Sequence, residues 1–233
     1  MFLLLNPLTI LVAAAVIPAL ILLWEVYKYD RLEREPGNLL LSLVLKGIVA
    51  TALAIITERI GIAVLGTLFQ TDSFIYNVLL MYLVVGLSEE GFKYLLLRLS
   101  TWNSPHFNCR FDGVVYAVFV SLGFALWENI SYVFSYGLGT ALVRAITAVP
   151  GHACFGVFMG TWYGLAKKQS LWGQEDTSMV CRTMAVLMPV IIHGTYDLLA
   201  TMGNTWIFLI FIAVMFAISF STVKRLSHSD HYL

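Results

Sequence analysis

Acidic side chains occur inside apolar stretches of this sequence, at spacings that suit hydrolytic chemistry. Glu89 and Glu90 are adjacent, and Lys93 follows Glu89 by four residues, so that on a helix the lysine can neutralise one of the two carboxylates. Two adjacent carboxylates in a low dielectric cannot both carry a charge cheaply, so one of them is expected to exchange a proton near neutral pH. Such a carboxylate is the usual general base for activating water. We therefore predict that Glu89 or Glu90 is the catalytic base, with Glu89 preferred and Lys93 tuning the pair.

Two histidines and two further acids complete a set of residues that a divalent metal could use. His193 and Asp197 are four residues apart and share one helix face, and Glu128 and His152 lie in two other apolar stretches. Zinc accepts histidine nitrogen and carboxylate oxygen and leaves one position for water. The predicted ligands are Glu128, His152 and His193, with Asp197 as a fourth ligand or as the partner of a ligand. Asn129 is a candidate oxyanion donor.

Each of these groups also has a purely structural interpretation. A single histidine or glutamate inside a membrane often makes only a packing hydrogen bond between helices. An ionisable side chain at the centre of a spanning helix costs about 2.5–3.5 kcal/mol, however, and the adjacent acids Glu89 and Glu90 cost more than packing returns. The whole set is therefore interpreted as functional. Arg144, near a helix end, is instead expected to extend its charged group toward the interface.

The elements that position these residues are membrane-spanning helices. Of 233 residues, 59% are hydrophobic and 12% are charged, about half the charged share of a soluble domain. A spanning helix needs about 20 apolar residues, so the fold class is all-α, a polytopic membrane helix bundle of about seven helices. The expected helices are Phe2–Tyr27, Asn38–Thr57, Ser73–Leu97, Phe111–Phe134, Thr140–Ala166, Val180–Ala200 and Asn204–Thr222. The stretch Ile60–Phe69 is too short to span and either continues the second helix or lies at the interface.

The basic residues indicate how the helices are oriented. They gather in the first, third and fifth loops and in the C-terminal tail, and the alternate loops hold few of them. Basic loops face the cytoplasm, so the pattern predicts a cell-membrane protein with its N-terminus outside and its C-terminus in the cytoplasm. The first apolar stretch lacks a basic leader and a small-residue cleavage site, so we interpret it as a retained span.

A glycine stripe indicates how the catalytic groups could meet. Gly156, Gly160 and Gly164 follow His152 at four-residue intervals, so a neighbouring helix can approach closely on the face that carries the histidine. Pro150 can bend the same helix. We expect one transmembrane domain over residues 1–233, with a motif-bearing core at 73–200 and a water-accessible cavity between the third, fourth, fifth and sixth helices.

Several other functions do not fit the sequence. The balance of 14 basic and 14 acidic residues provides no basic surface for nucleic acid. Three cysteines without a C-x-x-C spacing predict neither a disulfide framework nor a zinc ribbon. A proton-coupled transporter remains an alternative because Glu and His chains can relay protons, but transporters usually show internal repeats and none is visible. A membrane scaffold would need no such cluster of acids and histidines.

At these residues the chain resembles the PrsW family of bacterial intramembrane proteases. Five segments carry the resemblance, in the order of the family and across roughly half of the chain. They are Ser88-Glu-Glu-Gly-Phe-Lys-Tyr94, Phe111-Asp-Gly-Val-Val-Tyr116, Ser121-Leu-Gly-Phe-Ala-Leu-Trp-Glu-Asn-Ile130, His152-Ala-Cys-Phe-Gly-Val-Phe-Met-Gly160 and His193-Gly-Thr-Tyr-Asp197.

The resemblance implies an endopeptidase that cuts a single-pass membrane protein in the lipid bilayer, such as an anti-sigma factor at its first site in a stress response. The family is related to the type II CAAX prenyl proteases, which have asparagine where this chain has Asp197. An aspartate suits a metal ligand or a partner that orients a histidine, whereas an amide suits an oxyanion donor. Two mechanisms therefore stay open. In the preferred one a divalent metal, expected to be zinc, assists the glutamate, and in the other the glutamate acts without metal.

Overall fold

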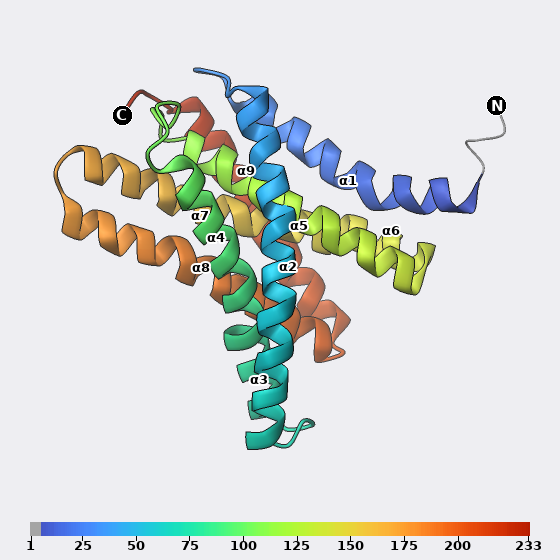
Figure 1. Cartoon of the computed structure of the whole chain (residues 1–233). Coiled ribbons are helices and arrows are strands. Elements are labelled where there is room, and N and C mark those ends of the chain that lie inside the picture. Colours follow the sequence, from blue (N-terminus) through green and yellow to red (C-terminus); the bar gives the residue numbers. More distant parts are fainter. Residues whose placement is uncertain (1–5) are drawn as a thin grey trace.

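Ten helical segments follow one another along residues 6–233, the part of the chain that the computed structural model describes (Figure 1). Seven continuous runs of them are long and apolar enough to cross a membrane, which confirms the predicted fold class. The segments are α1 (Pro7–Tyr29), α2 (Gly37–Leu68), α3 (Phe74–Leu79), the π-helical η2 (Leu80–Gly86), α4 (Leu87–Thr101), α5 (Asp112–Tyr136), α6 (Leu138–Ile146), α7 (Ala148–Leu171), α8 (Glu175–Thr201) and α9 (Thr205–His228).

Several boundaries differ from the predicted ones by a few residues, and three spans differ in their make-up. Residues 60–68 continue α2, so the uncertain stretch belongs to the second helix. The third span joins α3, η2 and α4 into one run, and the fifth joins α6 and α7. The helix is interrupted at Thr147, between α6 and α7. Pro150 lies in the first turn of α7, where a backbone N–H would have no partner within the helix, so the proline removes no helical hydrogen bond. The start of the first predicted helix, residues 2–5, lies outside the described residues.

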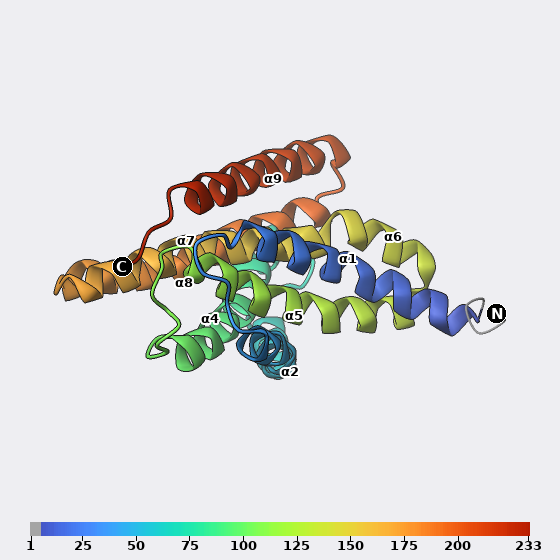
Figure 2. The same ribbon diagram turned by 90° about the horizontal axis from the view of Figure 1, so that it is seen from above.

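Helix α5 lies at the centre of the bundle, with α2, α7 and α1 packed around it (Figures 1 and 2). Of its most apolar 18-residue window, 78% is buried, compared with 17–50% for the other spans. Glycines permit these close contacts. A Cβ at Gly156 would lie 2.9 Å from the Cα of Val118, and one at Gly160 would overlap the backbone of Gly113. The glycine stripe thus packs on α5, as predicted, and this packing directs His152 of α7 toward α5.

Contacts between distant segments place the basic loops at one end of the bundle. The tail pairs with the loop before α5, where Leu233 N donates to Asn108 O at 2.7 Å. Asn108 Nδ2 donates in turn to Glu33 in the loop before α2, at 3.2 Å. The tail residue His231 lies 3.3 Å from Lys168, near the end of α7. The first, third and fifth loops and the tail therefore share one side, as the seven-span arrangement requires.

Buried carboxylates lie in these loops. Asp30 and Glu35 are 1% and 5% exposed, and each has one carboxylate oxygen without a hydrogen-bond partner. Burial raises the pKa of Asp30 to about 6, with a smaller contribution from Asp230, and burial likewise raises the pKa of Glu35 to about 7. Asp112 at the start of α5 accepts from Asn108 N and Cys109 N in the loop before that helix.

These raised pKa values predict how stability depends on pH. A carboxylate whose folded-state pKa is raised stabilises the fold below its unfolded pKa, about 4, and that contribution is lost as the pH rises through the folded value. We expect Asp30→Asn to raise the free energy of unfolding by about 1–3 kcal/mol at pH 8 and to have no effect at pH 4. Thermal unfolding in detergent at both values measures this. The exposed Asp72→Asn is the control, and equal effects of Asp30→Asn at the two pH values would contradict the prediction.

Candidate active site

A π-helical segment and a glycine bring the paired acids next to α8. The segment η2 ends at Gly86, directly before the α4 residues that include Glu89 and Glu90. A Cβ at Gly86 would lie 3.2 Å from Val190 O of α8, and a Cβ at Gly194 would lie 2.7 Å from the ring of Tyr82 in η2. π-helical turns are rare and often occur at functional sites. Because Gly194 follows His193, this close contact places the histidine beside the acids.

The ammonium group of Lys93 lies at the centre of the site. Its Nζ is 2.7 Å from Glu90 Oε1, 3.3 Å from Glu89 Oε2 and 3.0 Å from His152 Nδ1. It also lies 4.0 Å from the ring centroid of Phe124. The side chain is fully buried, and so is that of Glu90. The predicted pairing of Lys93 with Glu89 is present, but Glu90 makes the shorter contact.

The tautomer of His152 follows from its two neighbours. An ammonium can only donate, so Nδ1 of His152 accepts from Lys93. The proton is then on Nε2, which donates to Glu128 Oε2 at 2.8 Å. His152 thus connects the acids of α4 with the carboxylate of α5, and neither of its nitrogens is left without a partner.

His193 faces carboxylates at both ring nitrogens. Its Nδ1 lies 2.9 Å from Glu90 Oε1, and its Nε2 lies 3.4 Å from Asp197 Oδ2. The ring stacks on Phe155, with centroids 4.5 Å apart. Asp197 therefore contacts the ring nitrogen opposite the one that faces Glu90, and its two predicted roles stay predictions.

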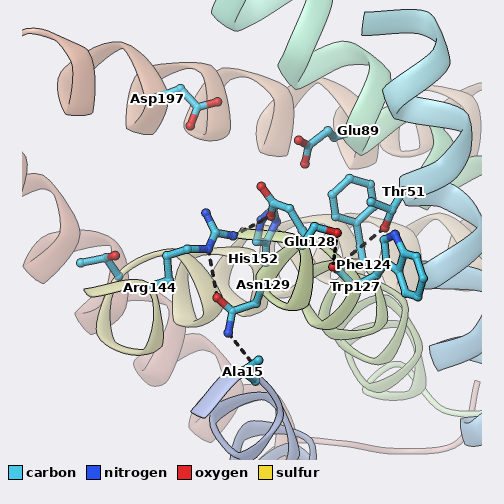
Figure 3. Close-up of polar contacts among 12 residues, drawn as sticks. Ala15, Thr51, Glu89, Phe124, Trp127, Glu128, Asn129, Arg144, His152 and Asp197 are labelled. Carbon is cyan, nitrogen blue, oxygen red and sulfur yellow. Dashed lines mark hydrogen bonds and ion pairs between the residues drawn. The ribbon is translucent and has the colours of Figure 1, made fainter. Parts of the chain in front are cut away.

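A cavity of about 460 Å³ opens beside this network. Glu89 lines it, whereas Glu90 does not. In Figure 3, Glu89 and Asp197 reach from opposite sides toward the space in front of Glu128. The predicted cavity between four spans is present, but α2 also contributes to its wall. Its charged and histidine side chains are Glu58, Glu89, Glu128, Arg144, His152, His193 and Asp197.

Asn129 is the predicted site residue that the structure turns away from the cavity. Its Nδ2 donates to Ala15 O of α1 at 2.8 Å, and its Oδ1 accepts from Arg144 Nε at 3.0 Å. The amide is fully buried, and Figure 3 shows it pointing toward α1. Both ends of the amide are occupied, so we correct its predicted role as oxyanion donor to one of positioning Arg144.

Arg144 and Glu58 are the cavity residues that the sequence interpretation missed. Arg144 does not extend to the interface but turns inward, where its Nη2 lies 3.0 Å from Glu128 Oε2. Glu58 lies in α2 directly after Thr57, the predicted end of the second helix. An ionisable side chain within a span is costly and therefore indicates a functional role, and this rule could have identified Arg144 and Glu58 as it did Glu128.

The arrangement does not fit a bound metal while Lys93 holds its position. Donor atoms of Glu89, Glu90, His152 and His193 lie within 4.8 Å of one another, a set that differs from the predicted ligands. Zinc binds such donors at about 2.0–2.2 Å. Lys93 Nζ is within 3.0 Å of both Glu90 Oε1 and His152 Nδ1, so an ion bonded to both would touch the ammonium and be repelled by it. The Nδ1 lone pair of His152 already accepts a hydrogen bond from Lys93, so it is not free to bind a metal ion.

Comparisons with known proteins find similar sequences over most of the chain. Residues 35–223 match the family model described as "PrsW family intramembrane metalloprotease". The chain is 30% identical over 202 residues to the Protease PrsW of Bacillus subtilis (strain 168), covering 85% of this chain and 86% of that protein. It is 32% identical over 224 residues to the Protease PrsW of Halalkalibacterium halodurans, covering 94% and 98%. It is also 30% identical over 223 residues to the Protease PrsW of Clostridioides difficile (strain 630), covering 92% and 91%. No solved structure matches the chain.

Proposed function

We infer that this chain, which belongs to the PrsW family of intramembrane proteases, cleaves a single-pass membrane protein with Glu89 as the base that activates water. One observation carries the assignment of the base. Glu89 is the carboxylate of the adjacent pair that lines the cavity, whereas Glu90 is fully buried and is held by both Lys93 and His193. Of the adjacent pair, Glu89 is therefore the carboxylate placed to meet water and a peptide bond in that cavity.

The proposed reaction uses residues from opposite walls of the cavity. Glu89 takes a proton from water, and the resulting hydroxide adds to the carbonyl carbon of the substrate. The Arg144 guanidinium, held by Glu128 and Asn129, stabilises the negative charge that develops on the carbonyl oxygen, as preorganised donors do in other hydrolases. Glu89 then returns the proton to the nitrogen of the leaving amine as the carbon–nitrogen bond breaks, so that one water is consumed for each bond cleaved.

For the cation of the site we propose Lys93 rather than a metal ion. Two of the four groups that could bind a metal are carboxylates, and the ammonium lies at hydrogen-bonding distance from Glu89, Glu90 and His152. This choice departs from the metal-assisted mechanism that the sequence favoured and from the word metalloprotease in the family description. The position of Lys93 supports the metal-free alternative.

The substrate that we propose is a membrane-anchored anti-sigma factor, as the motif resemblance implies. The cavity extends along α5 to Tyr132 and along α8 to Thr201, the last residue of that helix. Both positions lie toward the end of the bundle opposite the basic loops. A substrate span would therefore be cut near the boundary of the membrane on that side, which is where a first cleavage would release an external domain.

For the orientation we propose that the basic loops and the C-terminus face the cytoplasm, which places the N-terminus outside. The two halves of the arrangement can be tested with single cysteines in a variant that lacks Cys109, Cys154 and Cys181. We expect Leu138→Cys, at the start of α6, to react with an impermeant maleimide in intact cells. We expect Gln174→Cys, between α7 and α8, to react only after the cells are opened. Labelling of Gln174→Cys from outside would contradict the orientation.

The proposed activity can be tested with purified components. Wild-type protein is reconstituted in liposomes with a membrane-anchored anti-sigma factor from the same organism, tagged at both ends. We expect two fragments whose new termini, located by mass spectrometry, lie in or beside the substrate span. The soluble domain of the same substrate, without its span, should remain intact. Cleavage of that soluble domain at the same rate would contradict an intramembrane reaction.

A further inference from the structure

A second groove, separate from the active site, lies between α4 and α8 toward the end of the bundle that carries the basic loops. Its volume is about 490 Å³. Tyr94 and Arg98 of α4 and Arg182 of α8 line its polar part, and Met179, Val186 and Leu187 of α8 line its apolar part. Arg98 is three residues before the end of α4, and Arg182 is seven residues after the start of α8. The groove therefore lies near the membrane boundary, where lipid headgroups meet acyl chains.

The polar part of the groove has more donors than acceptors. Arg98 makes no ion pair with any residue in the range 6–233. Arg182 Nη2 donates to Glu175 at 3.2 Å on the exposed start of α8, and its Nε donates to Ser178 O at 3.4 Å, so part of its guanidinium group has acceptors of its own. The hydroxyl of Tyr94 is buried and has no hydrogen-bond partner. Both arginines lie close enough to that hydroxyl to interact with it electrostatically. Two arginines thus line the groove, with an unpartnered hydroxyl buried beside them, a donor set that suits the oxygens of a phosphate.

The apolar part of the groove determines what kind of phosphate fits. Met179 and Leu187 are 58% and 41% exposed, and they continue from the arginines along α8 into the span. A free phosphate would leave these side chains uncovered, whereas the acyl chains of a phospholipid would cover them. Basic pockets between spanning helices at the cytoplasmic side bind anionic lipid headgroups in other membrane proteins.

We propose that this groove binds an anionic phospholipid of the surrounding leaflet. The phosphate contacts Arg98, Arg182 and the Tyr94 hydroxyl, and an acyl chain lies along Met179 and Leu187. The lipid joins α4, which carries Glu90, to α8, which carries His193. Because these two side chains are 2.9 Å apart in the active site, a lipid that holds the helices together supports that contact from the same pair of helices.

Lipid binding to the full chain in detergent tests the proposal. The protein is titrated with palmitoyl-oleoyl phosphatidylglycerol or with the zwitterionic phosphatidylcholine of the same chains, and bound lipids are counted by native mass spectrometry. We expect one phosphatidylglycerol to bind most tightly and to raise the thermal unfolding temperature. Replacing both Arg98 and Arg182 by glutamine should weaken that site roughly 30-fold, since each basic residue near an anionic surface contributes about fivefold.

Matched variants separate the groove from general surface charge. Arg31→Gln combined with Lys224→Gln removes two exposed basic residues from the same end of the bundle and should leave the site unchanged. Lysine at positions 98 and 182 should retain most of the binding, which guards against misfolding of the glutamine variant. Equal binding of both lipids, or equal losses in the groove and control variants, would overturn the proposal. Binding of an acidic peptide to the wild type without lipid would also overturn it, if the glutamine variant of Arg98 and Arg182 no longer binds that peptide. The groove would then be a docking site for protein.

Discussion

Glu89→Gln is expected to slow peptide-bond cleavage by about 10²–10⁴-fold, the usual contribution of a general base, while the protein folds as before. The amide keeps the size of the side chain and can still accept from Lys93, which lies 3.3 Å from the carboxylate. It cannot take a proton from water. Removing a negative charge from the cavity wall should leave the unfolding temperature unchanged or raise it, as often happens when a catalytic group is removed.

Glu90→Gln should behave differently, although it alters the adjacent residue. Glu90 accepts from both Lys93 and His193 and is fully buried, so its loss leaves two donors without their carboxylate. Breaking a buried ion pair from one side costs about 3–5 kcal/mol. We expect this variant to lose both activity and stability. Rates of substrate cleavage and thermal unfolding of the two variants provide the comparison.

Glu58→Gln is the matched control for both variants. It removes a carboxylate from the same cavity. Unlike Glu89 and Glu90, Glu58 forms no ion pair with Lys93. Its activity should stay within about tenfold of the wild type, well short of the loss expected for a base. A stable but inactive Glu90→Gln together with an active Glu89→Gln would show that Glu90, and not Glu89, is the general base.

Lys93→Met is expected to convert the site into one that binds a divalent metal. Methionine has a similar length but no charge, so the acids and both histidines lose the cation at their centre. The Nδ1 lone pair of His152 becomes free, and four donors within 4.8 Å of one another then suit zinc. We expect about one zinc per chain in Lys93→Met and less than a tenth of that in the wild type, measured by elemental analysis after dialysis against zinc. Zinc at 1,000 times its dissociation constant should also stabilise the folded variant by up to about 4 kcal/mol, which raises its unfolding temperature.

Two comparisons make the metal prediction specific. Adding His152→Ala to Lys93→Met should remove the bound zinc, since the site then lacks a central ligand. A strong chelator should leave wild-type cleavage unchanged. Stoichiometric zinc in the wild type, with activity that a chelator removes and zinc restores, would contradict the role of Lys93 and support the metal-assisted mechanism.

Contacts within one helix could be predicted from the sequence, and contacts between helices could not. The four-residue spacing that linked Glu89 to Lys93 and His193 to Asp197 holds, because an α-helix fixes which residues share a face. No such rule relates α7 to α4, so the contact between His152 and Lys93 was not foreseen. Arg144 shows the same limit. Its inward direction depends on the break at Thr147 and on how α6 lies against α5, and neither follows from periodicity.

The π-helical segment also determines which changes in chain length the protein can accept. An α-helix advances about 100° per residue, so a one-residue deletion elsewhere in the third span would turn Glu89 and Glu90 away from His193. Within residues 80–86 the hydrogen bonds span one residue more than in an α-helix. A deletion there can be absorbed by conversion to an ordinary α-helical turn, with the flanking residues still in register. Among related sequences, a one-residue gap in this span should therefore occur at η2.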